Sequence, residues 1–222
     1  DEHRVFFTLL GALAIGLSLG LLGSGGSILT VPVLLYLVGQ PEKLAIGGSL
    51  LVVGLIASSA AVPYALHRQV DWRNVAWFGL PGMLGAWLGA TLAHWVPGAV
   101  QLALFAVVML VAAWRMLRGA AMQRTEHEPR RMAVVAGGFA VGALSGLVGV
   151  GGGFLIVPAL VLLAGVPMIN AVGTSLAVIA LNSLTGFAKY LGVLERHSLA
   201  LDWGVLLTVA AVGVVGSIAG HR

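Results

Sequence analysis

The sequence contains no cysteine, and its charged side chains are scarce. Without cysteine there can be no disulfide, no thiol catalysis and no cysteine-ligated metal. Asp, Glu, Lys and Arg make up 9% of the residues, against about 25% in an ordinary soluble domain. Five stretches contain none of these four residue types: 5–41, 44–66, 74–114, 132–188 and 203–220. A soluble globular domain cannot bury that much apolar chain in one core, and a disordered tail would be polar.

Apolar residues take the place of the missing charges. They account for 59% of the chain, and the mean hydropathy is +1.02. A membrane-spanning helix needs about 20 apolar residues, whereas the strands of an outer-membrane barrel alternate polar and apolar side chains. The continuous runs therefore predict an all-α polytopic membrane protein embedded in a lipid bilayer.

The net charge of +4 comes from arginines that gather outside the apolar runs. Five of them fall within 17 residues: Arg115, Arg118, Arg124, Arg130 and Arg131. In a soluble protein such an excess would suggest nucleic acid, but in a membrane protein the positive-inside rule accounts for it. We therefore predict no nucleic-acid partner.

The sequence also contains an internal repeat. Residues 20–64 and 146–190 are identical at 19 of 45 positions at a fixed offset of 126. The matches include the pairs Gly23/Gly149, Gly25/Gly151, Gly26/Gly152, Pro32/Pro158, Gly39/Gly165, Pro41/Pro167, Gly47/Gly173 and Ser49/Ser175. At an offset of 131 the similarity resumes, because Asp71-Trp72 matches Asp202-Trp203 and Gly82, Gly85 and Gly89 match Gly213, Gly216 and Gly220.

Apolar runs bounded by glycine and proline predict the helices. We expect them at about 5–22, 28–38, 43–66, 73–95, 98–118, 132–148, 153–164, 168–191 and 203–220. The segments 28–38 and 153–164 are too short to cross about 30 Å at 1.5 Å per residue. Each repeat is therefore expected to hold a Gly-broken helix pair followed by spanning helices.

The number of helical pieces predicts the orientation of the two repeats. A complete repeat of five pieces crosses the membrane an odd number of times, so the two copies are inverted. We expect a first membrane repeat at 1–118, a basic linker at 119–131 and a second membrane repeat at 132–222. Arg68 and Arg73 fall on the side of the linker, which places the linker in the cytoplasm. The second copy has no counterpart of 98–118, so we expect its last helix to be absent from this sequence.

Two glycine turns, Gly23–Ser27 and Gly149–Gly153, each open a short helix. A helix N-terminus has free backbone N–H groups and a partial positive charge, and glycine lets an anion approach them. Inverted repeats that bring two broken helices to the midplane are a recurring transporter design. The turns therefore predict an anion site, and the alternative is that these glycines serve only close helix packing.

These motifs resemble those of the TauE/SafE sulfite exporter family. The resemblance rests on the doubled Gly-x-Gly-Gly turn, the Val-Pro that follows it, Gly47-Gly48-Ser49 with Gly173-Thr174-Ser175, and the paired Asp-Trp. It covers nearly the whole chain and implies a bacterial inner-membrane permease for a small inorganic or organosulfur anion such as sulfite or sulfoacetate. The first turn departs from the second, because Ser24 and Ser27 stand opposite Val150 and Gly153.

We expect the substrate to bind between the two turns. The predicted binding residues are Gly25, Gly26, Ser27, Gly151, Gly152, Gly153, Ser49, Thr174, Ser175, Asn182 and Lys189. For the hydroxyl and amide side chains, the alternative is hydrogen bonding between helices or back to the same helix. Lys189 is charged and deep in a predicted span, so it would attract the anion or release a proton. The alternative for Lys189 is that it lies near its helix end and reaches the interface beside Tyr190.

The remaining polar residues predict no catalytic site and no cofactor. Asp71 and Asp202 each precede a tryptophan at a helix start, which indicates helix N-caps with interfacial anchors. The six histidines have no metal-ligand spacing, and the Gly-x-Ser-Gly of an intramembrane serine protease is absent. We predict an alternating-access secondary transporter that exports a small sulfur-containing anion and is not an enzyme. The alternative is an anion channel on the same scaffold, and the sequence leaves a homo-oligomer open.

Overall fold

The computed structural model describes residues 10–18, 26–117, 131–149 and 152–220. Within these ranges the protein is helical and contains no strand, and residues 10–18 form a helix of their own. The elements that follow are α2 (Gly26–Pro32), the π-helix η1 (Val33–Leu37), α3 (Glu42–Leu66), α4 (Trp72–Asn74), the π-helix η2 (Val75–Gly79), α5 (Leu80–Leu92), α6 (Gly98–Leu117), α7 (Arg131–Val148), α8 (Gly153–Ala164), α9 (Met168–Arg196) and α10 (Trp203–Gly220).

Four helical stretches are long and apolar enough to cross a membrane. They are Glu42–Leu66, Trp72–Leu92, Arg131–Val148 and Met168–Arg196. The helices of α2 with η1 and of α8 are shorter, as predicted for the two half-helices. The prediction of an all-helical, multi-pass membrane protein is therefore confirmed.

The helix caps agree with the sequence, and among the described residues the largest difference from the predicted helix ends is at the end of α9. The Asp71 carboxylate accepts hydrogen bonds from Arg73 N and Asn74 N, and Asp202 accepts one from Val205 N, so both predicted N-caps are confirmed. The predicted end of the helix at 191 is wrong, because α9 continues to Arg196. Val193 and Leu194 in this extra turn are buried, and their packing outweighs the weak helix propensity of the preceding glycine.

The centre of the bundle is the pair α3 and α9. Both helices are buried over most of their length, and each places a glycine against a tyrosine of the other. A β-carbon at Gly47 would lie 2.9 Å from Cδ1 of Tyr190, and one at Gly173 would lie 2.9 Å from Cβ of Tyr64. Small residues let helices approach closely inside a membrane, so these glycines set the distance between the two central helices.

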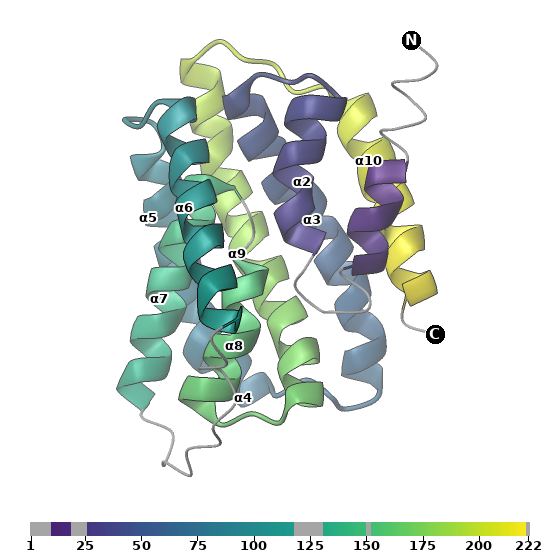
Figure 1. Cartoon of the computed structure of the whole chain (residues 1–222), viewed down its shortest axis with the longest axis vertical. Helices are drawn as coiled ribbons and strands as arrows, with labels where there is room; N and C mark the ends of the chain where they lie inside the picture. Colours follow the sequence, from purple (N-terminus) through teal and green to yellow (C-terminus); the bar gives the residue numbers. More distant parts are fainter. Residues whose placement is uncertain (1–9, 19–25, 118–130, 150–151, 221–222) are drawn as a thin grey trace.

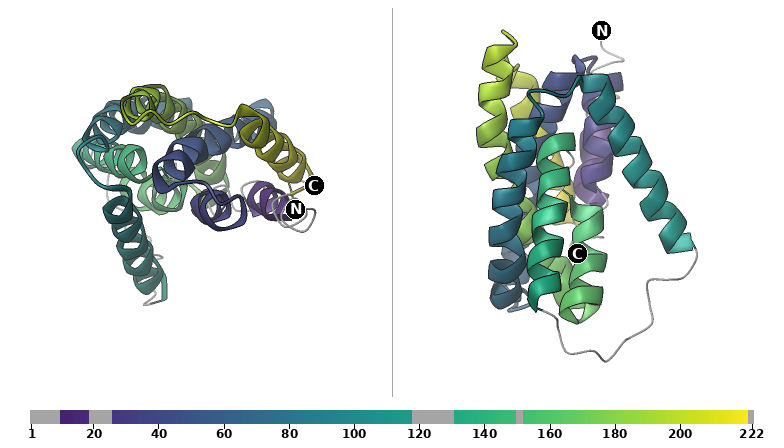
Figure 2. Two further views of the ribbon diagram at one scale, coloured as in Figure 1. Left: turned by 90° about the horizontal axis from the view of Figure 1, so that it is seen from above. Right: turned by 90° about the vertical axis from the view of Figure 1, so that its left-hand side faces the viewer.

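A second close pair, α5 and α7, lies beside the centre. A β-carbon at Gly142 would overlap the carbonyl of Gly82, and one at Gly146 would overlap the carbonyl of Ala86. The long helix α6 lies beside this pair, and its C-terminal end leans away from the bundle (Figure 2).

The two short helices point in opposite directions. Figure 1 shows α2 running toward one end of the bundle, where α3 begins, and α8 running toward the other end, where α9 begins. Their first turns approach each other, because Ile28 of α2 and Phe154 of α8 pack on one small cluster of buried residues. This cluster consists of Val31, Phe105 and Val148.

Candidate functional site

The turn between α7 and α8 is built from glycines that no other residue replaces without strain. Gly149 and Gly152 both have positive φ, +81° and +66°, a region that L-residues with a side chain rarely adopt. A β-carbon at Gly149 would lie 2.6 Å from the carbonyl oxygen of Ile46 on α3, and one at Gly152 would lie 3.0 Å from Cγ1 of Val141. The break in the helix is therefore pressed against α3 on one side and against α7 on the other.

The N-terminus of α8 has no side-chain cap. Gly152 is its N-cap residue and has no side chain to offer, so the first N–H groups have no partner from that residue. These groups and the helix dipole together favour a negative charge at this point. The sequence prediction of a glycine-cradled helix start at 152–153 agrees with this geometry.

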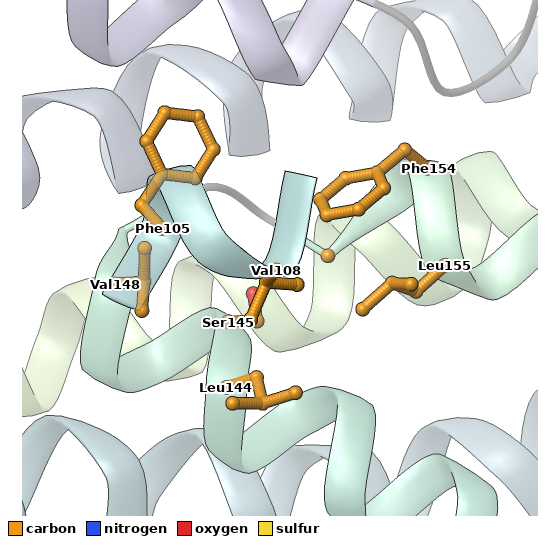
Figure 3. Close-up of a pocket in the computed structure, with 8 residues that line it drawn as sticks. Phe105, Val108, Leu144, Ser145, Val148, Phe154 and Leu155 are labelled. Carbon is orange, nitrogen blue, oxygen red and sulfur yellow. The ribbon is translucent and has the colours of Figure 1, made fainter. Parts of the chain in front are cut away.

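A pocket lies directly at this helix start. It is lined by residues of α6, α7 and α8: Phe105, Val108, Leu144, Ser145, Val148, Gly152, Phe154 and Leu155. Figure 3 shows Phe105 and Phe154 on either side, with Ser145 between them. Ser145 is the one hydroxyl among these residues. Its Oγ is buried and has no hydrogen-bond partner in the described part of the chain.

Ser145 was not among the predicted binding residues, although the sequence holds a signal for it. It is the one side chain between residues 132 and 153 that carries an oxygen or nitrogen atom. A buried hydroxyl without a partner costs about 1–3 kcal/mol. A residue that bears this cost beside an uncapped helix start is a candidate ligand.

Ser49 joins the glycine turn to the central helices. Its hydroxyl lies 2.7 Å from the carbonyl of Ile46 and also contacts the carbonyl of Gly149. A hydroxyl has one proton, so it donates to one carbonyl at a time. The structure thus brings Ser49 to the turn, where it holds the end of α7 against α3.

Four of the other predicted residues lie on α2 and α9. Ser27 is buried in the first turns of α2, which start beside the same apolar cluster as α8. Thr174 accepts a hydrogen bond from Asp71 N at 2.9 Å, and Ser175 donates to Val172 O at 2.7 Å, so both sit in the early turns of α9, away from the pocket lining. Gly26 is the first residue of α2, and Gly25 and Gly151 lie outside the described residues.

Asn182 and Ser183 are buried in the middle of α9 without partners. Asn182 is 0% exposed, and neither its Nδ2 nor its Oδ1 has a hydrogen-bond partner among the described residues. The hydroxyl of Ser183 is also buried and has no hydrogen-bond partner among the described residues. One turn further along, Gly186 lies against Gly146 of α7. The unpaired amide is therefore close to the helix that carries Ser145, although it does not line the pocket.

Lys189 points to a different neighbour. Its ammonium lies 4.6 Å from the ring centroid of Trp87 on α5, in the geometry of a cation–π contact. Trp87 is itself exposed on the outside of the bundle. The structure does not bring Lys189 to the pocket at α8.

Gln101 connects α6 to the broken end of α7, and the sequence analysis missed it. Its Nε2 donates to Leu147 O at 2.9 Å, and its Oε1 lies 3.5 Å from the hydroxyl of Tyr190. Gln101 is the one polar side chain between 98 and 113, which is the signal that would have found it. It therefore donates to a carbonyl in the last turn of α7, beside the helix break.

The long apolar helices and the glycine break between α7 and α8 define a multi-pass membrane protein with an uncapped helix start and a buried hydroxyl in its interior. The sequence matches the family described as "Sulfite exporter TauE/SafE" over residues 8–222, and the chain belongs to this family. The predicted resemblance is confirmed. The family is one of membrane transporters, so the prediction that the protein is not an enzyme holds as well.

Several curated relatives are similar over most of the chain. A "Probable membrane transporter protein" of Xylella fastidiosa (strain Temecula1) is 40% identical over 212 residues, which cover 93% of this chain and 78% of the relative. YunE of Bacillus subtilis, with the same description, is 31% identical over 214 residues (84% and 78%). A probable membrane transporter protein of Methanocaldococcus jannaschii is 30% identical over 188 residues (80% and 70%). No solved structure matches the chain.

Proposed function

We propose that this protein is a secondary transporter that exports a small sulfur-containing anion, such as sulfite or an organosulfonate, across the bacterial inner membrane. The observation that carries the proposal is the uncapped start of α8 beside the unpartnered hydroxyl of Ser145. Together they offer backbone and side-chain donors to an anion at a break in the helix. The family's description names sulfite, a small oxyanion that such donors can bind.

The proposed architecture is a pair of inverted repeats, 1–118 and 132–222, joined by the linker at 119–131. Equivalent contacts support it. A side chain at Gly142 would overlap the carbonyl of Gly82, and one at Gly16 would overlap the carbonyl of Gly213. These two contacts are related by the sequence offsets of 126 and 131. The contacts of Gly47 with Tyr190 and of Gly173 with Tyr64 are related by the offset of 126 in the same way.

The proposed orientation places the linker in the cytoplasm. The end of the bundle where α3 stops and α7 starts (Figure 1) carries three arginines: Arg68, Arg73 and Arg131. At the opposite end, Lys43 and Arg196 are accompanied by Glu42 and Glu195. The more basic end is expected on the cytoplasmic side.

In the proposed mechanism the anion enters from the cytoplasm, drawn by the arginine-rich end. It binds where α2 and α8 start, with Ser27, Ser145, Gly152 and Gly153 around it and the amide of Asn182 as a further donor in the path. One repeat then rocks against the other, and the site opens to the outside. Thr174 and Ser175 act in this proposal by holding α9 and the loop before α4 in place.

The test is sulfite transport by the purified protein in liposomes, with a matched pair of glycine variants. Gly152 and Gly165 both have positive φ, but a β-carbon at Gly165 meets nothing within 4 Å. Gly152→Ala and Gly165→Ala therefore share the backbone strain, and only the first fills the anion site. We expect saturable sulfite flux that is lost in Gly152→Ala and retained in Gly165→Ala. Equal flux in the two variants would contradict the site, and flux that does not saturate would favour the channel.

A further inference from the structure

The pocket at the start of α8 contains no charged side chain. Seven of its lining residues are apolar or glycine, and the eighth is Ser145. The positive charge available there is that of a helix N-terminus, equivalent to about half an elementary charge. A hydroxyl adds one hydrogen bond and no net charge.

The two lysines, Lys43 and Lys189, are engaged elsewhere. The Lys189 ammonium lies over the ring of Trp87. The Lys43 ammonium donates to the carbonyls of Ala93 and Val96, the latter at 2.6 Å, at the end of the bundle where α3 begins (Figure 1). Neither residue lines the pocket, so a bound anion there has no full positive charge beside it from the described chain.

The charge of the pocket limits the charge of its ligand. The cost of taking an ion out of water grows with the square of its charge, whereas the attraction to a fixed helix dipole grows only linearly. A singly charged anion can be held by half a charge and a few neutral donors. A doubly charged anion would have about four times the desolvation cost and only twice the attraction.

The walls of the pocket add a second requirement. Phe105 and Phe154 face it from α6 and α8, with Val108, Leu144 and Leu155 around them (Figure 3). An apolar group on the ligand gains contact area there, whereas a compact anion with oxygens on every side loses water on all of them. The lining therefore favours a ligand with one charged and one apolar end.

We propose that the site accepts its substrate in a singly charged form, prefers a singly charged anion that carries an apolar group, and rejects doubly charged anions of the same shape. The inference rests on the proposed function, since it takes the pocket at α8 as the substrate site. For an anion that exists in both charge states, transport then follows the singly charged form.

The experiment compares three anions in liposomes containing the wild-type protein. Methanesulfonate keeps one charge throughout the pH range used, methylphosphonate has nearly the same shape and gains a second charge as the pH rises, and sulfate is doubly charged. We expect methanesulfonate flux at all pH values, methylphosphonate flux that falls at least about tenfold on its second deprotonation, and little sulfate flux.

Two serine variants link this selectivity to the pocket. Ser145→Ala removes the pocket hydroxyl, and Ser217→Ala removes an equally buried hydroxyl on α10 that donates to Val214 O. Methanesulfonate flux should fall about tenfold in Ser145→Ala, as for a lost hydrogen bond to a charged group, and stay unchanged in Ser217→Ala.

The outcomes separate the two proposals. Equal flux of methanesulfonate and of doubly charged methylphosphonate overturns the charge selectivity and leaves anion transport standing. An unchanged methanesulfonate flux in Ser145→Ala overturns the assignment to this pocket. Absence of flux for all three anions and for sulfite, with protein that is folded and inserted, overturns the proposed function itself.

Discussion

The side-chain amide of Asn182 lies directly against Gly82: a β-carbon at Gly82 would be 2.7 Å from both Nδ2 and Oδ1. The corresponding contact elsewhere in the bundle, at offsets of 126 and 131, places Ile56 against Gly213. The same packing is thus made once with an apolar side chain and once with a buried, unpaired amide. Packing therefore does not require the amide, which agrees with its proposed role as a donor in the path of the anion.

This comparison predicts that Asn182→Val separates stability from transport. Removing an unpaired buried amide relieves a cost of about 1–3 kcal/mol, so the melting temperature of the purified protein should stay the same or rise. Anion flux in liposomes should fall at least tenfold. A variant that is less stable and transports normally would show that the amide is structural.

The close contact of α5 and α7 predicts a large effect of one methyl group. Gly142→Ala forces the carbonyl of Gly82 away and separates the helices, at a cost of about 1–3 kcal/mol. Gly192→Ala on α9 is the matched control, because a β-carbon there meets nothing within 4 Å and alanine favours a helix by about 0.5–1 kcal/mol. Thermal unfolding in detergent should rank Gly142→Ala below the wild type and Gly192→Ala at or above it; the reverse order would refute the packing.

The position of Gln101 predicts that it orients the glycine turn. Gln101→Leu removes the hydrogen bond to the carbonyl of Leu147 and the contact with the hydroxyl of Tyr190, which should lower stability by about 1–3 kcal/mol. Because the end of α7 is then less firmly held, we expect the KM for the anion to rise more than the maximal rate falls.

The control for Gln101 is Gln40→Leu, since Oε1 of Gln40 is buried and has no partner among the described residues. Its stability should be unchanged or higher, and its KM should match that of the wild type. A KM that does not respond in Gln101→Leu would mean that the residue only packs α6 against the bundle.

The contact between Lys189 and Trp87 predicts a structural role for the cation. A cation–π contact contributes about 0.5–2 kcal/mol, so Lys189→Gln should lower stability by about 1 kcal/mol and leave the anion flux within twofold of the wild type. If the flux is lost while the melting temperature is unchanged, Lys189 serves the anion or a coupled proton instead.

The helices and their caps could be predicted because they depend on local sequence. Apolar runs without charge predict membrane spans. Asp71 and Asp202 could be recognised as helix caps from the Asp-Trp pairs. Gly152 could be recognised as the start of α8 because a glycine run precedes a short apolar segment. The end of α9 could not, because the burial of Val193 and Leu194 depends on helices distant in the chain.

The candidate site divides in the same way. The sequence by itself determined that the protein is a helical membrane transporter of the TauE/SafE family with a glycine-broken helix at 152–153, because composition and spacing carry that information. Only the tertiary structure decided that Ser145 and Gln101 stand at this break, that Lys189 faces Trp87, and that the buried amide of Asn182 has no hydrogen-bond partner among the described residues. Which polar side chain is left unpaired depends on what the neighbouring helices bring to it, and that is a property of packing rather than of local sequence.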